Sequence, residues 1–274
     1  MEIAVLLTCH NRRDKTIACL DSLFNADLPF DFSLKVFLVD DGSIDGTSQA
    51  IKDKFSEVNI IQGNGALYWN RGMHLAWETA SNKKNYDYYL WINDDVTILK
   101  NSILILLENQ KKYVNSIICG VMVSNIDGNI TYGGRDEKSK MVLPNEKTPK
   151  KCYYVNGNLV LISKIIFEKV GLIDKIFLHA MGDFDYGLRV IENGFECRIS
   201  SKIVGFCESN NALPAWCLPE VGFIKRIKSL YSPLGNSHPY YFFIYESRHF
   251  HIFKALKHFI TIHLRLIFPK LWIK

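Results

Sequence analysis

The stretch "YYLWINDDV", residues 88–96, decides the fold class, because a run of strand-forming residues ends in two adjacent acids. Aromatic and aliphatic side chains fill positions 88–92, which is typical of a strand buried on both faces. Asp94 and Asp95 follow side by side, and two carboxylates this close repel each other unless a positive charge lies beside them. A bound divalent cation is one candidate for that charge. A solvated turn at the end of the strand is the alternative.

Two other segments repeat this arrangement of an apolar strand followed by polar residues. They are "EIAVLLTCHNR" at 2–12 and "SLKVFLVDDGS" at 33–43. Short apolar runs predict further strands at 59–65, 116–123, 157–163 and 197–207. Helical spacing of apolar residues lies between them at 13–25, 45–55, 71–81, 102–113, 164–171 and 183–194. Alternating strands and helices predict an α/β fold with a mostly parallel central sheet flanked by helices.

Residues 125–155 interrupt this alternation. The segment 125–140 has the pattern of a hairpin with its turn at Asp127-Gly128, and residues 141–155 are polar and irregular. Regular spacing resumes at 157 and continues to a helix that Gly194 is placed to end.

Composition limits the class of protein. Of the 274 residues 48% are hydrophobic and 22% charged, so a large globular core is expected, and a net charge of +5 does not indicate a nucleic-acid partner. Seven cysteines without a C-x-x-C pair argue against a zinc site and a disulfide framework, and favour reduced thiols in the cytoplasm. No signal peptide and no apolar run of about 18 residues is found, so a soluble or peripherally attached protein is expected.

The C-terminal part differs in kind from the rest, and we expect a catalytic domain at 1–220 and a basic, amphipathic helical extension at 221–274. Apolar residues recur there at steps of three and four, at Phe250, Phe253, Leu256, Ile260, Leu264 and Ile267. One interpretation is a helix packed on the catalytic domain or on the second subunit of a homodimer. The other is a cationic segment lying on the anionic inner face of the cell membrane.

Three polar strand ends predict the position of a site. Ligands of open parallel sheets bind beyond the carboxyl ends of the strands, and Thr8–Arg12, Asp40-Asp41 and Asn93–Asp95 would meet at that edge. An acid-lined edge suits a metal-bound diphosphate with its ribose or base. Neither G-x-x-x-x-G-K-[ST] nor G-x-G-x-x-G after the first strand occurs, so the glycine-rich phosphate cradles are absent.

Four motifs in order resemble the family 2 glycosyltransferases of the A-type fold, which are inverting enzymes that use nucleotide sugars. The motifs are "VLLTCHNR" at 5–12, "VFLVDDGSIDGT" at 36–47, "LWINDDV" at 90–96 and "GDFDYGLRVIENGF" at 182–195. The resemblance spans about residues 3–210. The stretches "GNGALYWNRGMHLAW" at 63–77 and "SPLG" at 232–235 are more similar to a bacterial subgroup that builds polysaccharides.

The resemblance implies a set of residues for a UDP- or dTDP-sugar donor. Asp41, or less favoured Asp40, would bond the uracil or thymine edge, whereas a turn and helix cap is the structural alternative. Trp69 would face the donor, with a place in the core as the alternative. The remaining positions implied are Thr8, His10, Asn11, Arg12, Gly65, Asn70 and Asp94 for the donor, and Asn156 and Gly157 in a turn on the acceptor side.

The resemblance also implies a cation and a base. Asp95 would bind Mg²⁺ or Mn²⁺, with Asp94 beside it on the metal or the ribose. Asp183 would be the general base, with an acidic helix cap as the alternative. Relatives usually carry Glu at the position of Gly182. Cys207-Glu208 occupies the strand position of the usual third metal ligand, for which His249 or His238 is the candidate replacement and a merely structural histidine the alternative.

The expected function is transfer of a sugar from a UDP- or dTDP-sugar to a hydroxyl of a glycan or lipid-linked acceptor during the synthesis of a cell-surface polysaccharide. One alternative is a sugar nucleotidyltransferase, but "TCHNRRDKT" at 8–16 lacks the glycines that would hold a triphosphate. The other alternative is a non-catalytic glycan-binding subunit with a degenerate site, for which the departure at Gly182 is the argument.

Overall fold

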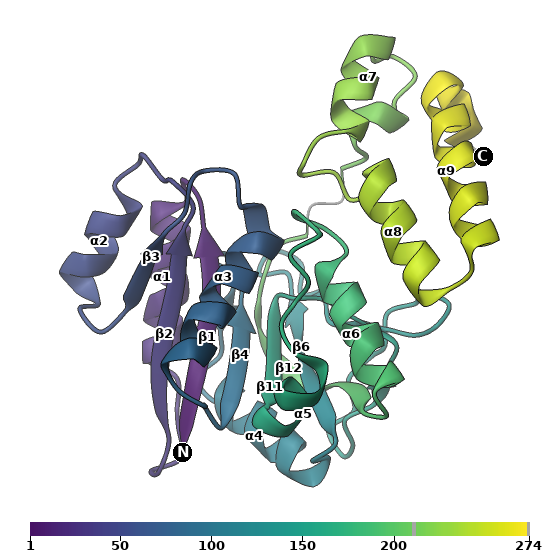
Figure 1. The fold of residues 1–274 in the computed structure, drawn as a ribbon. Coiled ribbons are helices and arrows are strands. Elements are labelled where there is room, and N and C mark those ends of the chain that lie inside the picture. The colour runs from purple at the N-terminus through teal and green to yellow at the C-terminus, as the bar shows by residue number, and fades with distance from the viewer. Residues whose placement is uncertain (210–211, 273–274) are drawn as a thin grey trace.

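The computed structural model describes residues 1–209 and 212–272, and a ten-stranded sheet forms the centre of this part of the chain (Figure 1). The strand order is β3-β2-β1-β4-β11-β6-β12-β5, with β7 paired to β6 and β9 to β12. The strands are β1 (Glu2–Cys9), β2 (Ser33–Asp40), β3 (Asn59–Gln62), β4 (Tyr88–Ile92), β5 (Thr97–Ile98), β6 (Ser116–Val123), β7 (Ile130–Tyr132), β9 (Lys151–Cys152), β11 (Leu159–Ser163) and β12 (Glu196–Phe206). A separate two-stranded sheet joins β8 (Gly134–Arg135) to β10 (Tyr154–Val155).

The α/β class is confirmed, but the sheet is more mixed than the sequence predicts. The pairs β1–β2, β1–β4, β2–β3 and β6–β12 are parallel, whereas β11 is antiparallel to both β4 and β6. Residues 124–158 leave the carboxyl end of β6 and return to the same edge before β11 begins. The first residues of β11 therefore lie beside the carboxyl end of β4, where the predicted site is.

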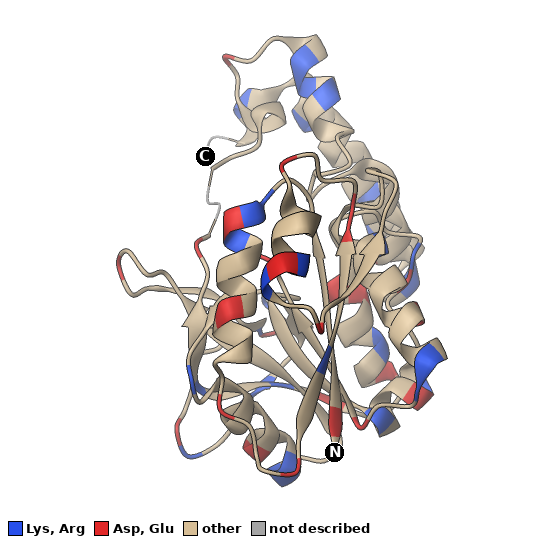
Figure 2. Ribbon diagram, turned by 90° about the vertical axis from the view of Figure 1, so that its left-hand side faces the viewer, with Lys and Arg blue, Asp and Glu red and all other residues tan. Residues whose placement is uncertain are grey.

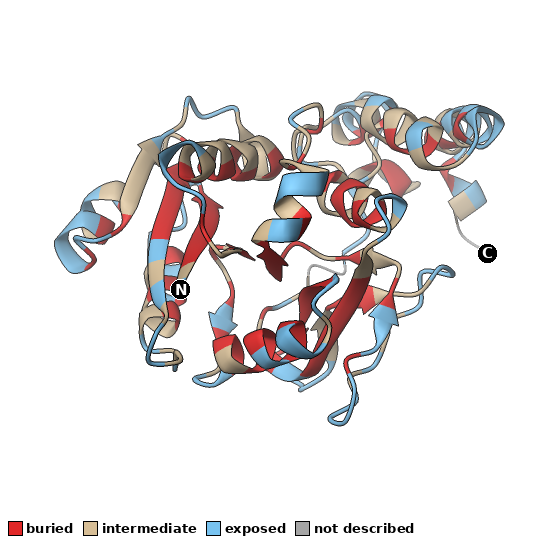
Figure 3. Ribbon diagram, turned by 60° about the horizontal axis from the view of Figure 1, so that its bottom comes forward, coloured by how far each residue is buried: buried red, intermediate tan, exposed pale blue. Residues whose placement is uncertain are grey.

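Helices cover both faces of the sheet because each strand alternates its apolar side chains between two cores. In β1, Val5 and Leu7 belong to one core and Ala4 and Leu6 to the other. The first core also contains residues of α1 (Arg13–Phe24), α2 (Thr47–Lys54) and α4 (Ser102–Lys112). The second contains residues of α3 (Tyr68–Lys83), α5 (Lys164–Val170) and α6 (Gly182–Glu192). Figure 3 shows the strands buried and the helices exposed on their outer sides.

The C-terminal part forms a helical unit beyond the carboxyl-end edge of the sheet (Figure 1). It consists of η1 (Ala215–Cys217), α7 (Phe223–Leu230), α8 (Pro239–His249), α9 (Ile252–Ile267) and η2 (Pro269–Trp272). Trp216, Leu230, Ile262 and Leu266 form its own small core. The predicted apolar stripe lies on α9, apart from Phe250, which falls in the break between α8 and α9. The predicted boundary between residues 220 and 221 stays a prediction.

Two other sequence predictions concern the chain as a whole. All seven cysteines lie in the described part of the chain, with free and buried thiols. None of the helices described has the length and apolarity needed to cross a membrane.

The hairpin predicted at 125–140 is shorter in the structure, because β7 pairs directly with the end of β6 around the turn at Gly128.

Candidate active site

Arg12 supplies the positive charge beside the two acids at the end of β4. Because β1 and β4 are neighbouring parallel strands, the residues after β1 face those after β4. The Nη1 atom of Arg12 lies 2.8 Å from Oδ1 of Asp94 and 3.1 Å from Oδ2 of Asp95. The guanidinium therefore offsets the repulsion between the two carboxylates.

Asp94 has the chemistry of an incomplete cation site. It is 5% exposed, and burial raises the pKa of its carboxyl to about 6, although Arg12 acts in the opposite direction. Its buried Oδ2 atom has no hydrogen-bond partner among the described residues. A buried carboxylate oxygen without a partner is costly, and a hard cation such as Mg²⁺ or Mn²⁺ would satisfy it.

The protein alone does not complete a metal site around these acids. Within residues 1–209 and 212–272 no group of three or more His, Cys, Asp or Glu side chains is arranged to hold a metal ion. This fits a Mg²⁺-type site, in which one or two carboxylates act together with water and substrate phosphate oxygens. Asp94 and Asp95 are the two carboxylates that would hold such an ion.

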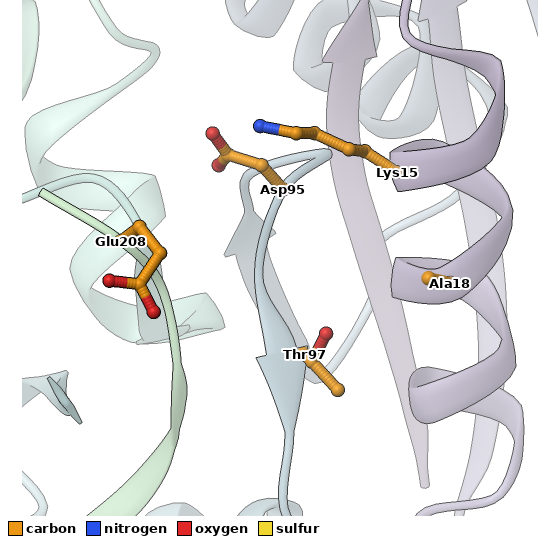
Figure 4. Close-up of a pocket in the computed structure, with 5 residues that line it drawn as sticks. All are labelled: Lys15, Ala18, Asp95, Thr97 and Glu208. Carbon is orange, nitrogen blue, oxygen red and sulfur yellow. The ribbon is translucent and has the colours of Figure 1, made fainter. Parts of the chain in front are cut away.

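A cavity of about 180 Å³ adjoins Asp95 (Figure 4), lined also by Lys15, Ala18, Thr97 and Glu208. Figure 4 shows the Lys15 ammonium pointing toward Asp95. Glu208 is held on the far side, where its Oε1 accepts from the Asn125 amide and its Oε2 from the Ser124 hydroxyl, both at 2.7 Å. Asp95 is therefore the acid of this cavity with a carboxylate turned toward the basic side chain.

Cys207 lies next to Asp95 but is not a suitable metal ligand. Its Sγ atom donates to Oδ1 of Asp95 at 3.7 Å. Burial, and then the charge of Asp95, raise the pKa of the thiol to about 12. The thiolate that would bind a metal is therefore disfavoured. Since Glu208 is bonded to residues 124–125, neither residue replaces the usual third ligand.

Asp183, the predicted base, lies in the first turn of α6. Its Oδ2 accepts from the Gly157 amide at 3.0 Å and its Oδ1 from the Phe184 amide at 2.9 Å. Burial raises the pKa of this carboxyl to about 6, and the two amides oppose the rise. A carboxylate with a pKa near 6 is ionised at neutral pH and is a stronger base than an ordinary aspartate.

Trp69 lies between Asp183, the predicted base, and Asn93, which precedes the two acids after β4. Its Nε1 atom donates to Oδ1 of Asn93 at 2.7 Å, and the Asn93 amide donates to the Asn158 carbonyl at 3.0 Å. A Cβ atom added to Gly157 would lie 2.5 Å from the Trp69 ring and 3.4 Å from Cβ of Asp183. The indole thus fills the space between the end of β4 and the turn whose Gly157 amide donates to Asp183, and glycine at 157 is what allows it.

Asp41 and Asp40 both accept hydrogen bonds from the protein's own loops. Asp41 is 3% exposed and accepts from three backbone amides, those of Gly65 at 2.8 Å, Leu67 at 2.9 Å and Tyr68 at 3.0 Å. Asp40 is buried and accepts from the Ser43 amide and the Ser48 hydroxyl. The expected contact of Asp41, or less favoured Asp40, with a base stays a prediction. Gly65 contributes its amide to the same loop.

The residues after β1 belong mostly to a backbone clamp. The Nδ1 atom of His10 donates to the Asp41 carbonyl at 2.6 Å. The Asn11 amide donates to the Ser43 hydroxyl at 2.9 Å, and its side-chain oxygen accepts from the Ile44 amide at 2.8 Å. Thr8 is buried at the end of β1. Of the four predicted positions here, Arg12 is the one whose side chain reaches the acids.

Asn70 packs against Gly182 at the start of α6. Asn70 is fully buried, and its Nδ2 atom donates to the carbonyls of Asp174 at 2.7 Å and Phe177 at 2.9 Å. A Cβ atom on Gly182 would lie 1.6 Å from Oδ1 of Asn70. The expected contact of Asn70 with the donor stays a prediction. Gly182 replaces the usual acid because Asn70 occupies its space while it holds residues 174–177.

His249, the predicted third metal ligand, lies between two carboxylates of α6. Its side chain is 1% exposed, with Nε2 2.8 Å from Oδ1 of Asp185 and Nδ1 2.7 Å from Oε1 of Glu192. Both ring nitrogens donate to carboxylates, so neither has a lone pair for a metal. His238, the other candidate, packs between Tyr231 and Tyr241 in the C-terminal unit.

His179 and Lys15 are two further candidate residues that the sequence motifs do not include. His179 precedes α6, and its buried Nδ1 atom makes no hydrogen bond to any described residue. Burial, and then the charge of Arg12, lower the pKa of its imidazole, which favours the neutral form. Its position four residues before Asp183 was the available signal. Lys15 follows the first strand by a single helical turn, which a charge count in "HNRRDK" at 10–15 could have indicated.

Comparisons with known proteins agree with this geometry. The pattern of "Glycosyl transferase family 2" matches residues 4–171. No protein in a comparison with curated sequences matches the chain. S. aureus TarS has a similar structure, with a TM-score of 0.60 at 14% identity over 91% of this chain and 43% of that chain. The present chain thus spans less than half the length of TarS.

Two further solved structures have the same fold. The mannosyltransferase PcManGT from Pyrobaculum calidifontis, in complex with GDP-Man and Mn²⁺, gives a TM-score of 0.59 at 16% identity over 96% of this chain and 69% of that chain. GalNAc-T7 with UDP, GalNAc and Mn²⁺ gives a TM-score of 0.59 at 15% identity, over 90% of this chain and 50% of that chain. At such identities the similarity shows the fold alone, and the A-type fold predicted from the motifs is confirmed. The family pattern covers more than half of the sequence, and this chain therefore belongs to glycosyl transferase family 2.

Proposed function

We propose that the chain transfers a sugar from a nucleotide sugar to an acceptor hydroxyl with inversion, using Mg²⁺ or Mn²⁺. The observation that carries the proposal is the buried Asp94, whose Oδ2 atom lacks a partner among the described residues while Arg12 bridges it to Asp95. Family membership gives the reaction class, and the printed Mn²⁺ complexes of PcManGT and GalNAc-T7 support a divalent cation.

The acids at the end of β4 and Arg12 would bind the diphosphate end of the donor. A cation held by Asp94 and Asp95 would offset the charge that develops on the departing diphosphate. Arg12 bonds the acids through Nη1, and its guanidinium carries further N–H groups suited to phosphate oxygens. Lys15, whose ammonium points toward Asp95 (Figure 4), adds a second positive charge to this end of the site.

Asp183 would accept the proton of the acceptor hydroxyl. The hydroxyl oxygen attacks the anomeric carbon while the bond from that carbon to the diphosphate oxygen breaks. The proton passes to the Asp183 carboxylate, and the nucleoside diphosphate leaves with the bonding electrons. A single displacement inverts the configuration at the anomeric carbon and requires no covalent intermediate with the protein.

The donor is proposed to be a UDP- or dTDP-sugar, and the acceptor a glycan or a lipid-linked glycan of a cell-surface polysaccharide. Structures of TarS carry UDP and UDP-GlcNAc, which favours a uracil nucleotide, whereas PcManGT carries GDP-Man. Since Asp41 already accepts from backbone amides, other groups of the loops after β1 and β2 would help to bind the base. A guanine nucleotide therefore belongs in any donor screen.

Neither alternative function is favoured by an observation. The family match assigns the chain to transferases of sugars rather than of nucleotides. The argument for a degenerate, non-catalytic site was Gly182, and the position of Asn70 against this glycine gives it a packing reason instead.

A donor panel tests the proposal. Purified protein is heated with UDP-, dTDP- and GDP-sugars, each with and without Mn²⁺, and the melting temperature is recorded. Binding to the native state at 100-fold excess over Kd adds about 2.7 kcal/mol, so a donor should raise the melting temperature only with the metal present. Asp95→Asn should abolish this response. Asp14→Asn, at an exposed carboxylate of α1, is the matched control.

Transfer itself is then measured as release of nucleoside diphosphate with a hydroxyl acceptor. A metal-dependent response to at least one donor, followed by release, is the expected result. A protein that responds to no nucleotide sugar in either condition would contradict the proposal.

A further inference from the structure

Helix α9 has an apolar face on each side. Its inner side buries Ala255, Ile262 and Leu266. The outer face of α9, opposite to these, carries Phe253, Leu256, Ile260, Leu264 and Ile267, which are 42% to 72% exposed. Their steps of three and four residues form one continuous stripe along the helix.

This outer face is larger than isolated exposed side chains would explain. Leu271, in the short helix η2 after α9, is 56% exposed, and Phe223 and Ile224 of α7 are exposed in the same helical unit. A contiguous apolar patch on a folded protein marks a surface that is covered by another molecule. The charge around the patch indicates which kind of molecule covers it.

The C-terminal helices are strongly basic, unlike the rest of the chain. Residues 221–274 contain nine Lys and Arg and one Glu, a formal charge of +8, so residues 1–220 carry −3 of the total of +5. Figure 2 shows Lys and Arg on these helices, where acidic residues are few. The single acid, Glu246, is 2% exposed and paired with His258 and Lys254, so it does not neutralise the surface.

The charges lie where an interfacial helix needs them. Lys257 is exposed and falls beside the stripe, at a helical angle of about 60° from its centre, and Lys270 is exposed in the turn that follows α9. Long lysine side chains at the border of an apolar face can extend to phosphate groups while their methylenes stay in the apolar layer. No helix of the described ranges can span a bilayer, so contact would be along the surface.

We propose that the outer face of α9 lies on the surface of an anionic lipid bilayer. The aliphatic and aromatic side chains enter the boundary between headgroups and acyl chains, and the flanking lysines bind lipid phosphates. A second copy of the chain is the less favourable occupant, because a two-fold contact through this face would bring two surfaces of the same positive charge together. The inference is independent of the proposed reaction.

The geometry of the neighbouring helices gives this contact a consequence for the site. Helix α8, which packs on α9, is bonded to the catalytic part through Arg248 and His249, both of which reach the carboxylate of Asp185 on α6. The C-terminal unit also lies beyond the carboxyl-end edge of the sheet (Figure 1). A bilayer contact at α9 would therefore hold the site edge close to the lipid surface.

Vesicle flotation with the full-length protein tests the inference. Vesicles of phosphatidylcholine alone are compared with vesicles containing about 30% phosphatidylglycerol, at low and high salt. The protein should float with the anionic vesicles at low salt, bind neutral vesicles at least tenfold less, and be released as salt increases.

Matched variants identify the surface. Ile260→Glu with Leu264→Glu should reduce flotation at least tenfold, and Lys257→Glu should weaken flotation at low salt. Val114→Glu with Ile165→Glu, at side chains 58% and 61% exposed outside the C-terminal unit, is the apolar control, and Lys111→Glu on α4 is the charge control. Circular dichroism checks the fold of each variant. All should keep the donor-dependent rise in melting temperature, so a failure here is distinguishable from a failure of the proposed function.

Three results would overturn the inference. One is absence of binding to anionic vesicles at low salt. Another is equal loss of binding in the Val114 and Ile165 control, which would assign binding to no particular face. The third is a stable dimer in light scattering that Ile260→Glu with Leu264→Glu converts to a monomer while vesicles stay unbound, since a second copy would then cover α9.

Discussion

Arg12 and Asp94 illustrate how a site can hold opposed charges before its ligand arrives. Burial alone would leave Asp94 largely protonated, and the Arg12 guanidinium at 2.8 Å offsets this. With a pKa of about 6, the carboxyl is mostly ionised at neutral pH but keeps one buried oxygen without a partner in the described chain. The Asp94 carboxylate can therefore accept either a proton or a metal ion, which suits a site that binds a metal together with a diphosphate.

At Asp183 we predict an acid limb in the pH dependence of turnover. The pKa of this carboxyl is raised to about 6, so the group is a proton acceptor above that pH and loses this capacity as pH falls through it. In the log of kcat against pH, the slope should approach one below about 6. Because Asp94 titrates in the same range, donor binding is measured separately by the melting temperature at each pH.

Asp183→Asn should remove the acid limb along with most of the activity. Loss of a general base reduces rates by about 10² to 10⁴. Donor binding should remain, since Asp183 contacts the amides of Gly157 and Phe184 rather than the acids of β4. Turnover like that of the wild type in this variant would show that another group takes the proton.

At Gly157 we predict that one added methyl group displaces Trp69, which lies between Asp183 and the end of β4. The added Cβ of Gly157→Ala would lie 2.5 Å from the Trp69 ring, so the indole must move and its bond to Asn93 is lost. A displacement of about 1 Å at a reacting group can cost 10²-fold in rate. Gly222→Ala, at a position with no atoms within 4 Å of the new methyl group, is the control.

Initial rates with saturating donor measure the effect, and thermal unfolding checks that the fold persists. Gly157→Ala with unchanged kcat would mean that the Trp69 contact is packing without influence on the base.

At the scale of elements, the sequence predicted most strands and helices but not the direction of β11. The run at 157–163 is apolar in either direction, so its pattern carries no information on whether it is parallel to its neighbours. The direction follows from the path of residues 124–158, which pair with the start of β12 through β9 and then return to the edge where β6 ends. This single reversal places Gly157 beside Asp183, which no spacing in the sequence indicates.

The same limit explains the site residues. Arg12, Asp94 and Asp95 follow polar strand ends, and Asp183 lies in a motif that resembles the family, so the sequence could indicate them. The partners of Asp41 are backbone amides of residues 65–68, and amides have no signature in a sequence. The partners of His249, Asp185 and Glu192, are more than fifty positions away and belong to α6, so its surroundings could not be predicted.

Between α8 and α6 we predict that Arg248 is the main attachment. Its Nη1 lies 2.6 Å from Oδ1 of the fully buried Asp185, and its Nη2 lies 2.8 Å from Oδ2 of Asp174. Arg248→Ala should lower the free energy of unfolding by about 1–3 kcal/mol, because a buried carboxylate loses a charged donor. Arg248→Lys keeps the positive charge but cannot bond both carboxylates with a planar guanidinium, so it should lose part of the same free energy of unfolding.

The remaining attachment then depends on pH through His249. Burial lowers the pKa of this imidazole, but bonds to Asp185 and Glu192 outweigh burial and raise it. Its contribution is complete below the ordinary histidine pKa of about 6.5 and is lost as pH rises through the raised value. Urea unfolding of Arg248→Ala from pH 6 to 9 should show this decline. A flat profile would mean that His249 is not charged in the folded protein.

At the scale of the whole molecule, the chain divides its charge between two parts that share a contact. The acidic part, residues 1–220, carries the site, and the basic part carries the apolar outer face of α9. The parts meet where Phe177 and Leu188 pack on Tyr245, next to the charged attachment at Asp185. Because this junction buries both apolar and ionic groups, we expect the two parts to unfold together.

A chain ending at Glu220 tests that expectation. It would leave Asp185 without Arg248 and His249 and expose Phe177 and Leu188, so the loss should exceed that of Arg248→Ala. With about 1–3 kcal/mol for the ionic attachment and a similar amount for the apolar contact, and about 2–4 °C per kcal/mol at this size, the melting temperature should fall by roughly 5–15 °C. Calorimetry of the full chain should show one transition. Two separate transitions of the full chain would mean that residues 1–220 form an independent domain. A shortened chain that melts at the original temperature would mean that the contact between α8 and α6 adds nothing to the stability of that domain.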